Sequence, residues 1–126
     1  METVLIYESD TELSAAWASY FSHDGIAVFT TTDSLEAAEI ISMINIDSMI
    51  ISSDNPATFL LLGRVLRSCK ISPKIVAVSS LEISNLQLLL ESDNFELLKK
   101  PFTFSTLKSL IRNFNTKTEV RQNVLV

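Results

Sequence analysis

Residues 47–56 read Asp-Ser-Met-Ile-Ile-Ser-Ser-Asp-Asn-Pro. The apolar run at 49–51 is followed by small polar residues and then by a proline, which cannot continue the hydrogen bonding of a strand. This pattern predicts a buried strand at about 48–51 that delivers a polar loop to one edge of a sheet. In open parallel sheets, ligands bind beyond the carboxyl ends of the strands, so residues 52–54 are predicted to lie at the functional edge.

Four further apolar runs lack polar alternation, which is typical of strands covered on both faces. They are predicted at residues 4–7, 26–29, 75–78 and 95–99. Apolar residues at helical spacing predict the intervening helices: one that begins at Asp10 or Thr11 and ends before Gly25, then 34–44, 57–70 and 81–92, and a last one that carries Leu107, Leu110, Ile111 and Phe114. Strands that alternate with helices predict an α/β fold, a five-stranded, doubly wound parallel sheet with helices on both faces.

The helical spacing also predicts which side chains are buried. In the first helix, Trp17 is assigned to the core, and the periodic residues are Leu13, Ala16, Trp17, Tyr20 and Phe21. In the second helix, Ser34 is the expected cap, and the residues predicted to face inward are Leu35, Ala38, Ile41 and Met43 or Ile44. Cys69 is expected to be a packing residue near the end of a helix.

The amino-acid composition excludes several classes of function. The chain has 126 residues, enough for one domain with a sizeable core. A net charge of -5 argues against wrapping nucleic acid or lying on an anionic membrane, because both need a basic face. A single cysteine excludes an internal disulfide, and no secretory signal or transmembrane run is apparent, so we expect a cytoplasmic protein. With two glycines, the chain offers no glycine-rich phosphate loop.

Three polar loops are predicted to converge on one edge of the sheet. They are Glu8-Ser9-Asp10, Ser52-Ser53-Asp54 and Ser79-Ser80, and Lys100 arrives from the last strand. This order resembles the receiver domain of two-component response regulators, a flavodoxin-like (βα)5 fold, and the resemblance covers about the whole chain. Its strongest part is Lys100-Pro101-Phe102 with the helix that follows. In the family, an aspartate lies five positions before the phosphoacceptor and a proline four after it; here both offsets, from Asp47 and Pro56, point to Ser52.

The resemblance implies a role for each site residue. In receivers, an acceptor aspartate and two further acids hold Mg²⁺, while a hydroxyl and a lysine bind the phosphoryl oxygens. By resemblance Glu8 keeps one acid position, Ser79 the hydroxyl and Lys100 the lysine. The second acid position falls on Ser9 and the acceptor position on Ser52.

These two departures predict a degenerate site. Mg²⁺ prefers carboxylate oxygens, so only weak binding is expected, with Glu8, Asp10 and Asp54 as candidates, and we expect no cofactor. A serine hydroxyl without a neighbouring base is a poor nucleophile. Lys100, short of counter-charges, is expected to pair with Glu8 or Asp54. The family's switch aromatic falls on Leu97, with Phe95 as a substitute. The resemblance then implies a pseudo-receiver: a non-enzymatic module of bacterial signalling that binds proteins independently of phosphorylation.

The helices at 57–70 and 81–92 are more apolar than one buried stripe requires. In the receiver arrangement they are neighbours, so their leucines either form a docking patch or a homodimer face, or they fill a deep core. The sequence does not favour either the surface role or the core role of these leucines. Leu61, Arg64 and Leu88 are the first surface candidates.

Two other functions stay open. The chain is either a phosphorylatable, Mg²⁺-dependent receiver that uses Asp54, or a flavodoxin-like domain that binds a small ligand at the same edge. Residues 1–114 are assigned to the receiver-like domain, and residues 115–126 to a tail, a helix extension or a linker.

Overall fold

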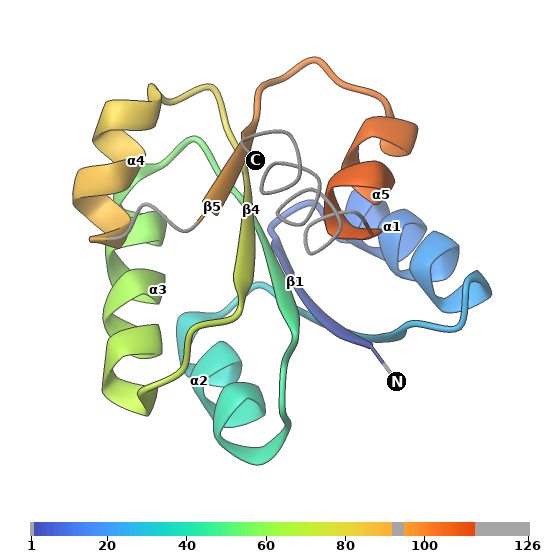
Figure 1. The fold of residues 1–126 in the computed structure, drawn as a ribbon, viewed down its shortest axis with the longest axis horizontal. Helices are drawn as coiled ribbons and strands as arrows, with labels where there is room; N and C mark the ends of the chain where they lie inside the picture. The colour runs from blue at the N-terminus through green and yellow to red at the C-terminus, as the bar shows by residue number, and fades with distance from the viewer. Residues whose placement is uncertain (1, 92–94, 113–126) are drawn as a thin grey trace, which may run out of the picture.

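The computed structural model describes residues 2–91 and 95–112. Five parallel strands form one sheet in the order β2-β1-β3-β4-β5, as Figure 1 shows in part. The strands are β1 (Thr3–Glu8), β2 (Ala27–Thr31), β3 (Ser48–Ser52), β4 (Lys74–Val78) and β5 (Phe95–Leu98). The predicted α/β class and the parallel sheet are therefore confirmed.

The register aligns the carboxyl ends of four neighbouring strands. Glu8 pairs with Ser52, Ser52 pairs with Val78, and Val78 pairs with Leu98. The loops that follow these residues therefore start at one level of the sheet. This alignment places the three predicted polar loops and Lys100 at one edge.

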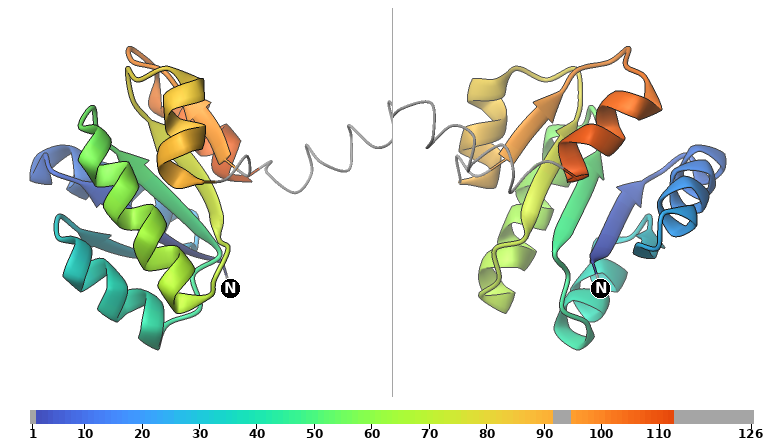
Figure 2. Two further views of the ribbon diagram at one scale, coloured as in Figure 1. Left: turned by 90° about the vertical axis from the view of Figure 1, so that its left-hand side faces the viewer. Right: turned by 45° about the vertical axis from the view of Figure 1, so that its right-hand side comes forward.

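Five helices cover the two faces of the sheet. They are α1 (Thr11–His23), α2 (Ser34–Met43), α3 (Pro56–Cys69), α4 (Ile83–Leu90) and α5 (Phe104–Arg112). Helices α1 and α5 lie on one face, and α2, α3 and α4 lie on the other (Figures 1 and 2).

The core has one cluster on each face of the sheet. Alternate residues of a strand enter different clusters: Ile50 packs with Trp17 and Phe21 beneath α1, whereas Met49 and Ile51 pack beneath α2 and α3. Both faces of the central strands are thus apolar, which explains why their sequences show no alternation. The assignment of Trp17 to the core is confirmed. Cys69 packs against the cluster beneath α2 and α3.

Polar side chains cap the amino ends of several helices, and Thr103 Oγ1 accepts the Thr106 amide at the start of α5. Asp10 caps α1, because its Oδ1 accepts hydrogen bonds from the backbone amides of Glu12 and Leu13. Asp33, rather than the expected Ser34, caps α2. Asn55 caps α3, and Pro56 occupies the first turn, where no backbone donor is needed.

The inward face of α2 agrees with the prediction only in part: Ile41 is buried and Ile44 packs against the core, as predicted. Leu35 is 73% exposed and Met43 is 82% exposed, whereas Ala37 and Ile41 are buried. Residues four apart lie on one side of a helix, so the choice of Ala37 and Ile41 turns Leu35 and Met43 outward. In α1 likewise, the buried residues are Ser14, Trp17 and Phe21, and Leu13, Ala16 and Tyr20 are exposed.

The remaining differences concern element ends. Strand β2 begins one residue later than predicted and extends to Thr31, and α3 spans Pro56–Cys69 rather than 57–70. Helix α4 is shorter than the predicted 81–92, and β5 ends at Leu98. Phe114 and the tail at 115–126 lie outside the described residues.

Helices α3 and α4 are neighbours, as predicted (Figure 2). Gly63 permits a close approach, since a Cβ there would lie 3.2 Å from the Leu89 carbonyl oxygen and 3.3 Å from the Leu90 Cα. Arg67 Nη1 donates a hydrogen bond to the Leu90 carbonyl at 3.1 Å. Within the described ranges, no helix is long and apolar enough to cross a membrane.

Most of the surplus leucines on α3 and α4 fill the core. The buried residues are Phe59, Leu62, Leu66, Leu86 and Leu90. Leu61, Ile83 and Leu88 are the large apolar residues that these two helices leave exposed, and Arg64 is exposed as well. The core therefore takes most of the apolar surface of these helices, as one reading predicted, and a smaller exposed set remains, for which docking stays a prediction.

Candidate functional site

The centre of the site is a buried carboxylate beside a buried hydroxyl. Glu8 and Ser52 end neighbouring strands in register, and they are 6% and 2% exposed. Glu8 Oε2 accepts a hydrogen bond from the Ser9 amide at 3.0 Å. Ser52 Oγ has no hydrogen-bond partner among the described residues. A polar atom buried in this way costs free energy without stabilising the fold.

Asp54 connects three loops of the site. Its Oδ1 accepts a hydrogen bond from the Ser80 amide at 2.8 Å, and the Ser79 hydroxyl lies 3.5 Å from the same oxygen. Its Oδ2 lies 3.6 Å from Lys100 Nζ. Of the two partners expected for Lys100, the structure selects Asp54. The amide that Asp54 binds belongs to the loop after β4 and not to its own loop.

These contacts favour the ionised form of Asp54. The hydrogen bonds from Ser80 and the positive charge of Lys100 hold the pKa of the Asp54 carboxyl below its usual value. At neutral pH the site therefore contains a carboxylate, although one displaced by two positions from Ser52.

Ser53 and Ser79 hold the backbone of their own loops. Ser53 Oγ accepts a hydrogen bond from the Asn55 amide at 3.0 Å and lies 3.1 Å from the Thr58 hydroxyl. Ser79 is fully buried, and its Oγ accepts a hydrogen bond from the Leu81 amide at 3.1 Å. The loops after β3 and β4 are therefore ordered by their own serines.

The acidic candidates do not form a compact group. Asp10 is exposed and is used as the cap of α1, and Ser9 beside it is exposed. Across residues 2–91 and 95–112, no three His, Cys, Asp or Glu side chains gather closely enough to hold a metal ion. The structure thus places Glu8, Asp10 and Asp54 at one edge of the sheet without arranging them as a ligand set.

Leu97 and Phe95, the two positions considered for a switch aromatic, are both half-buried. Both pack against the apolar cluster beneath α3 and α4. Leu97 pairs with Ala77 in the register of β4 and β5, and Phe95 pairs with Ile75. The position nearest the site is therefore occupied by leucine.

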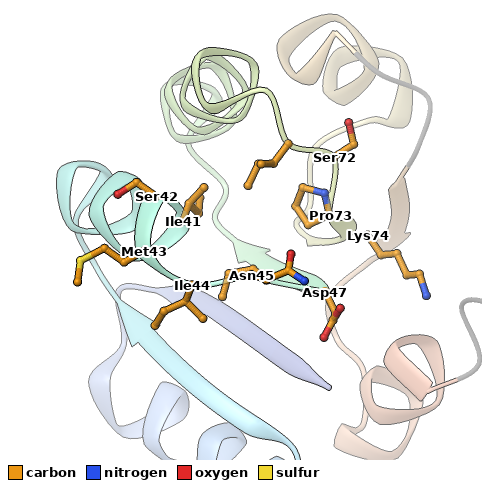
Figure 3. A pocket seen from close by; sticks show the side chains of 11 residues that line it. Ile41, Ser42, Met43, Ile44, Asn45, Asp47, Ser72, Pro73 and Lys74 are labelled. Atoms are coloured by element: carbon orange, nitrogen blue, oxygen red, sulfur yellow. The ribbon is translucent and has the colours of Figure 1, made fainter. Parts of the chain in front are cut away.

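Two cavities lie at opposite ends of the sheet. One of about 520 Å³ is found at the amino ends of β3 and β4, where Asp47 and Lys74 are among its lining residues (Figure 3). Asp47 Oδ2 also accepts a hydrogen bond from the Thr3 amide at 2.9 Å. The other, of about 600 Å³, lies beside the site and includes Glu8, Lys100 and Tyr20 among its lining residues. The sequence reasoning missed this second cavity. The sequence feature that could have indicated this cavity is the pair Phe102 and Phe104, which follows Lys100 within four residues.

The fold is shared with receiver domains of known structure. The receiver domain of a Francisella response regulator is 23% identical, with a TM-score of 0.71 over 94% of this chain and 99% of that one. A receiver domain from Bermanella marisrubri is 24% identical, with a TM-score of 0.71 over 88% and 95%. A CheY-like receiver domain from Methanospirillum hungatei is 17% identical, with a TM-score of 0.74 over 96% and 98%.

No protein-family model matches the chain, and no curated protein is significantly similar to it in sequence. At these identities the solved structures establish the fold alone. The chain has the flavodoxin-like fold of response-regulator receiver domains.

Proposed function

We propose that this chain is a pseudo-receiver, a cytoplasmic module of bacterial signalling that binds partner proteins without being phosphorylated and without a cofactor. The observation that carries the proposal is Ser52. It occupies the position that the resemblance assigns to the acceptor, at the end of β3 and opposite Glu8. A buried hydroxyl with no base hydrogen-bonded to it, within the described part of the chain, is a poor nucleophile for a phosphoryl group.

The contacts of Lys100 support the same proposal. In a receiver that is phosphorylated, the corresponding lysine binds the phosphoryl group. Here Lys100 already faces the Asp54 carboxylate, which also holds the amide of Ser80. Asp54 thus joins the loops after β3, β4 and β5 in the way that a phosphoryl group would. We infer that the site is held in one state and that the surface above it is permanently available.

The surface for a protein partner is proposed on α3 and α4. Leu61 of α3 and Leu88 of α4 expose apolar side chains, and Arg64 of α3 exposes a positive charge. Exposed apolar side chains that lie together are typical of interaction sites. A second copy of the chain is one candidate partner, which gives a homodimer through these helices. No nucleic acid or membrane is proposed as a partner.

Intact mass spectrometry with acetyl phosphate and Mg²⁺ tests the proposal. The wild type is expected to gain no phosphoryl group. The matched control is the double variant Ser9→Asp, Ser52→Asp, which restores both missing carboxylates and is expected to be labelled. Labelling of the wild type would contradict the proposal, whereas labelling of the variant alone would support both the fold assignment and the loss of chemistry.

A second candidate function is a phosphorylatable receiver that uses Asp54. The observation in its favour is that Asp54 is ionised, exposed and next to Lys100. Its weakness is that both oxygens already have partners, Ser80 and Lys100. Mg²⁺-dependent labelling that disappears in Asp54→Asn would select this function.

A further inference from the structure

The cavity beside the site has walls suited to an aromatic ligand. It lies between α1 and the segment that joins β5 to α5, and its volume of about 600 Å³ is in the range of small-molecule sites. Its aromatic lining comes from Trp17 and Tyr20 of α1 and from Phe102 and Phe104, and Phe104 also packs edge-on against Phe21. These two segments lie on the same face of the sheet (Figure 1).

The aromatic side chains are held in place by one another. Tyr20 stacks on Phe104 with ring centroids 4.6 Å apart, and Trp17 lies 6.1 Å from Phe102 in a tilted arrangement. Tyr20 is nevertheless 58% exposed. An exposed ring that is fixed by a stacking partner offers a preformed surface for a second aromatic group, because little conformational freedom is lost on binding.

The polar groups of the cavity favour a positive charge. Glu8 and Asp10 contribute two carboxylates, and Lys100 contributes one ammonium group. The charge of Lys100 is offset by Asp54, which is not part of the cavity lining. Glu8 is almost fully buried, and its Oε2 accepts a hydrogen bond from the Ser9 amide. Trp and Tyr faces also attract cations through their ring quadrupoles.

We propose that this cavity binds a small organic cation with an aromatic body, the ammonium group near Glu8 and Asp10 and the ring against Tyr20 and Phe104. The proposal goes beyond the proposed function, because it needs neither a partner protein nor a phosphoryl group. Lys100 lines the cavity and also contacts Asp54. A bound cation therefore lies next to the contact that joins the loops of the site.

Two probes that share a phenylethyl body test the charge preference on the full chain. Phenethylammonium carries a cation, and 3-phenylpropanoate carries a carboxylate. Trp17, the one tryptophan of the chain, lines the cavity and reports binding through its fluorescence when it is excited at wavelengths where the probes do not absorb. We expect a saturable change with phenethylammonium and roughly tenfold weaker binding of 3-phenylpropanoate, corresponding to a few favourable charge contacts.

Variants of the lining residues complete the test. Glu8→Gln combined with Asp10→Asn preserves side-chain size and the cap of α1, and it is expected to abolish the preference for the cation. Tyr20→Ala is expected to weaken both probes. Glu39→Gln, which removes one carboxylate charge at an exposed position of α2 outside the cavity lining, is the control and should bind like the wild type.

Three results would overturn the proposal: no saturable binding of phenethylammonium, equal binding of the two probes, or a cation preference that survives in the double variant. Circular dichroism of each variant separates loss of binding from loss of folding. None of these readouts involves a phosphodonor, so the cavity proposal and the pseudo-receiver proposal fail independently.

Discussion

Lys100 Nζ lies 3.6 Å from Asp54 Oδ2, and through this contact the loop after β5 meets the loop after β3. The other oxygen of Asp54 accepts the Ser80 amide at 2.8 Å, which adds the loop after β4. One exposed carboxylate therefore organises the edge of the sheet. Ser52, at the position that the resemblance assigns to the acceptor, makes no hydrogen bond through its hydroxyl within the described residues.

The first prediction concerns pH. Hydrogen bonds from Ser80 and the charge of Lys100 lower the pKa of Asp54 in the folded chain. A carboxyl with a lowered pKa stabilises the fold above its unfolded pKa of about 3.9, and this contribution is lost as the pH falls through the folded pKa. Asp54→Asn should therefore be less stable than the wild type at pH 7, and the difference should shrink below about pH 4.

Urea unfolding at several pH values measures this difference. Asp33→Asn is the matched control, because Asp33 caps a helix and asparagine caps helices equally well. Since Asp54 is exposed, the effect at pH 7 should be small, within the range of surface ion pairs and single hydrogen bonds. A pH-independent difference between Asp54→Asn and the wild type would show that the carboxylate charge is not the cause.

The central strands were the easiest to predict from the sequence because they are buried on both faces. Residues such as Met49, Ile50 and Ile51 have no exposed neighbour within their strand, so a continuous apolar run is sufficient to locate it. The site followed from the fold, since the parallel register brings Glu8 and Ser52 to one level. Lys100 was expected to pair with Glu8 or Asp54, and only the geometry of the loops could decide between them.

Helix faces were harder to predict because apolar residues are also found on exposed faces. Leu35 and Met43 of α2 are as hydrophobic as the buried Ile41, and nothing in their spacing excludes them from the core. The cavity beside the site was not predicted, since it depends on how Phe104 stacks on Tyr20, residues far apart in the sequence. Contacts between segments that lie far apart in the sequence leave no periodic pattern of apolar residues from which they could be predicted.

The second prediction compares two buried serines of the site. Ser52 Oγ has no hydrogen-bond partner among the described residues, whereas Ser79 Oγ accepts the Leu81 amide. Ser52→Ala should therefore leave the free energy of unfolding unchanged or raise it, and Ser79→Ala should lower it by about 1 kcal/mol. Denaturant unfolding of both variants measures the contrast. Equal losses would mean that the Ser52 hydroxyl is hydrogen bonded in solution.

The third prediction concerns the contact between α3 and α4. A Cβ at Gly63 would meet two backbone atoms of α4 at 3.2 and 3.3 Å, so in Gly63→Ala the backbone of α4 has to shift by about a few tenths of an ångström. Overpacking costs about 1–3 kcal/mol, while the gain in helix propensity from replacing glycine is about 1 kcal/mol. We expect a net loss of stability in thermal or urea unfolding. Ser68→Ala, at an exposed position of the same helix, should show no loss.

The last prediction separates the exposed leucines of α3 and α4 from the buried ones. Leu88 is 76% exposed and Leu61 is also exposed, whereas Leu62 is fully buried. Leu88→Ser should leave the free energy of unfolding of the monomer nearly unchanged, and Leu62→Ala should lower it by about 2–5 kcal/mol.

If a second copy of the chain covers this surface, Leu61→Glu with Leu88→Glu should abolish self-association in sedimentation experiments. The control is Leu35→Glu, an equally apolar and exposed position on α2. Self-association that persists in the double variant but disappears in Leu35→Glu would move the interface to α2.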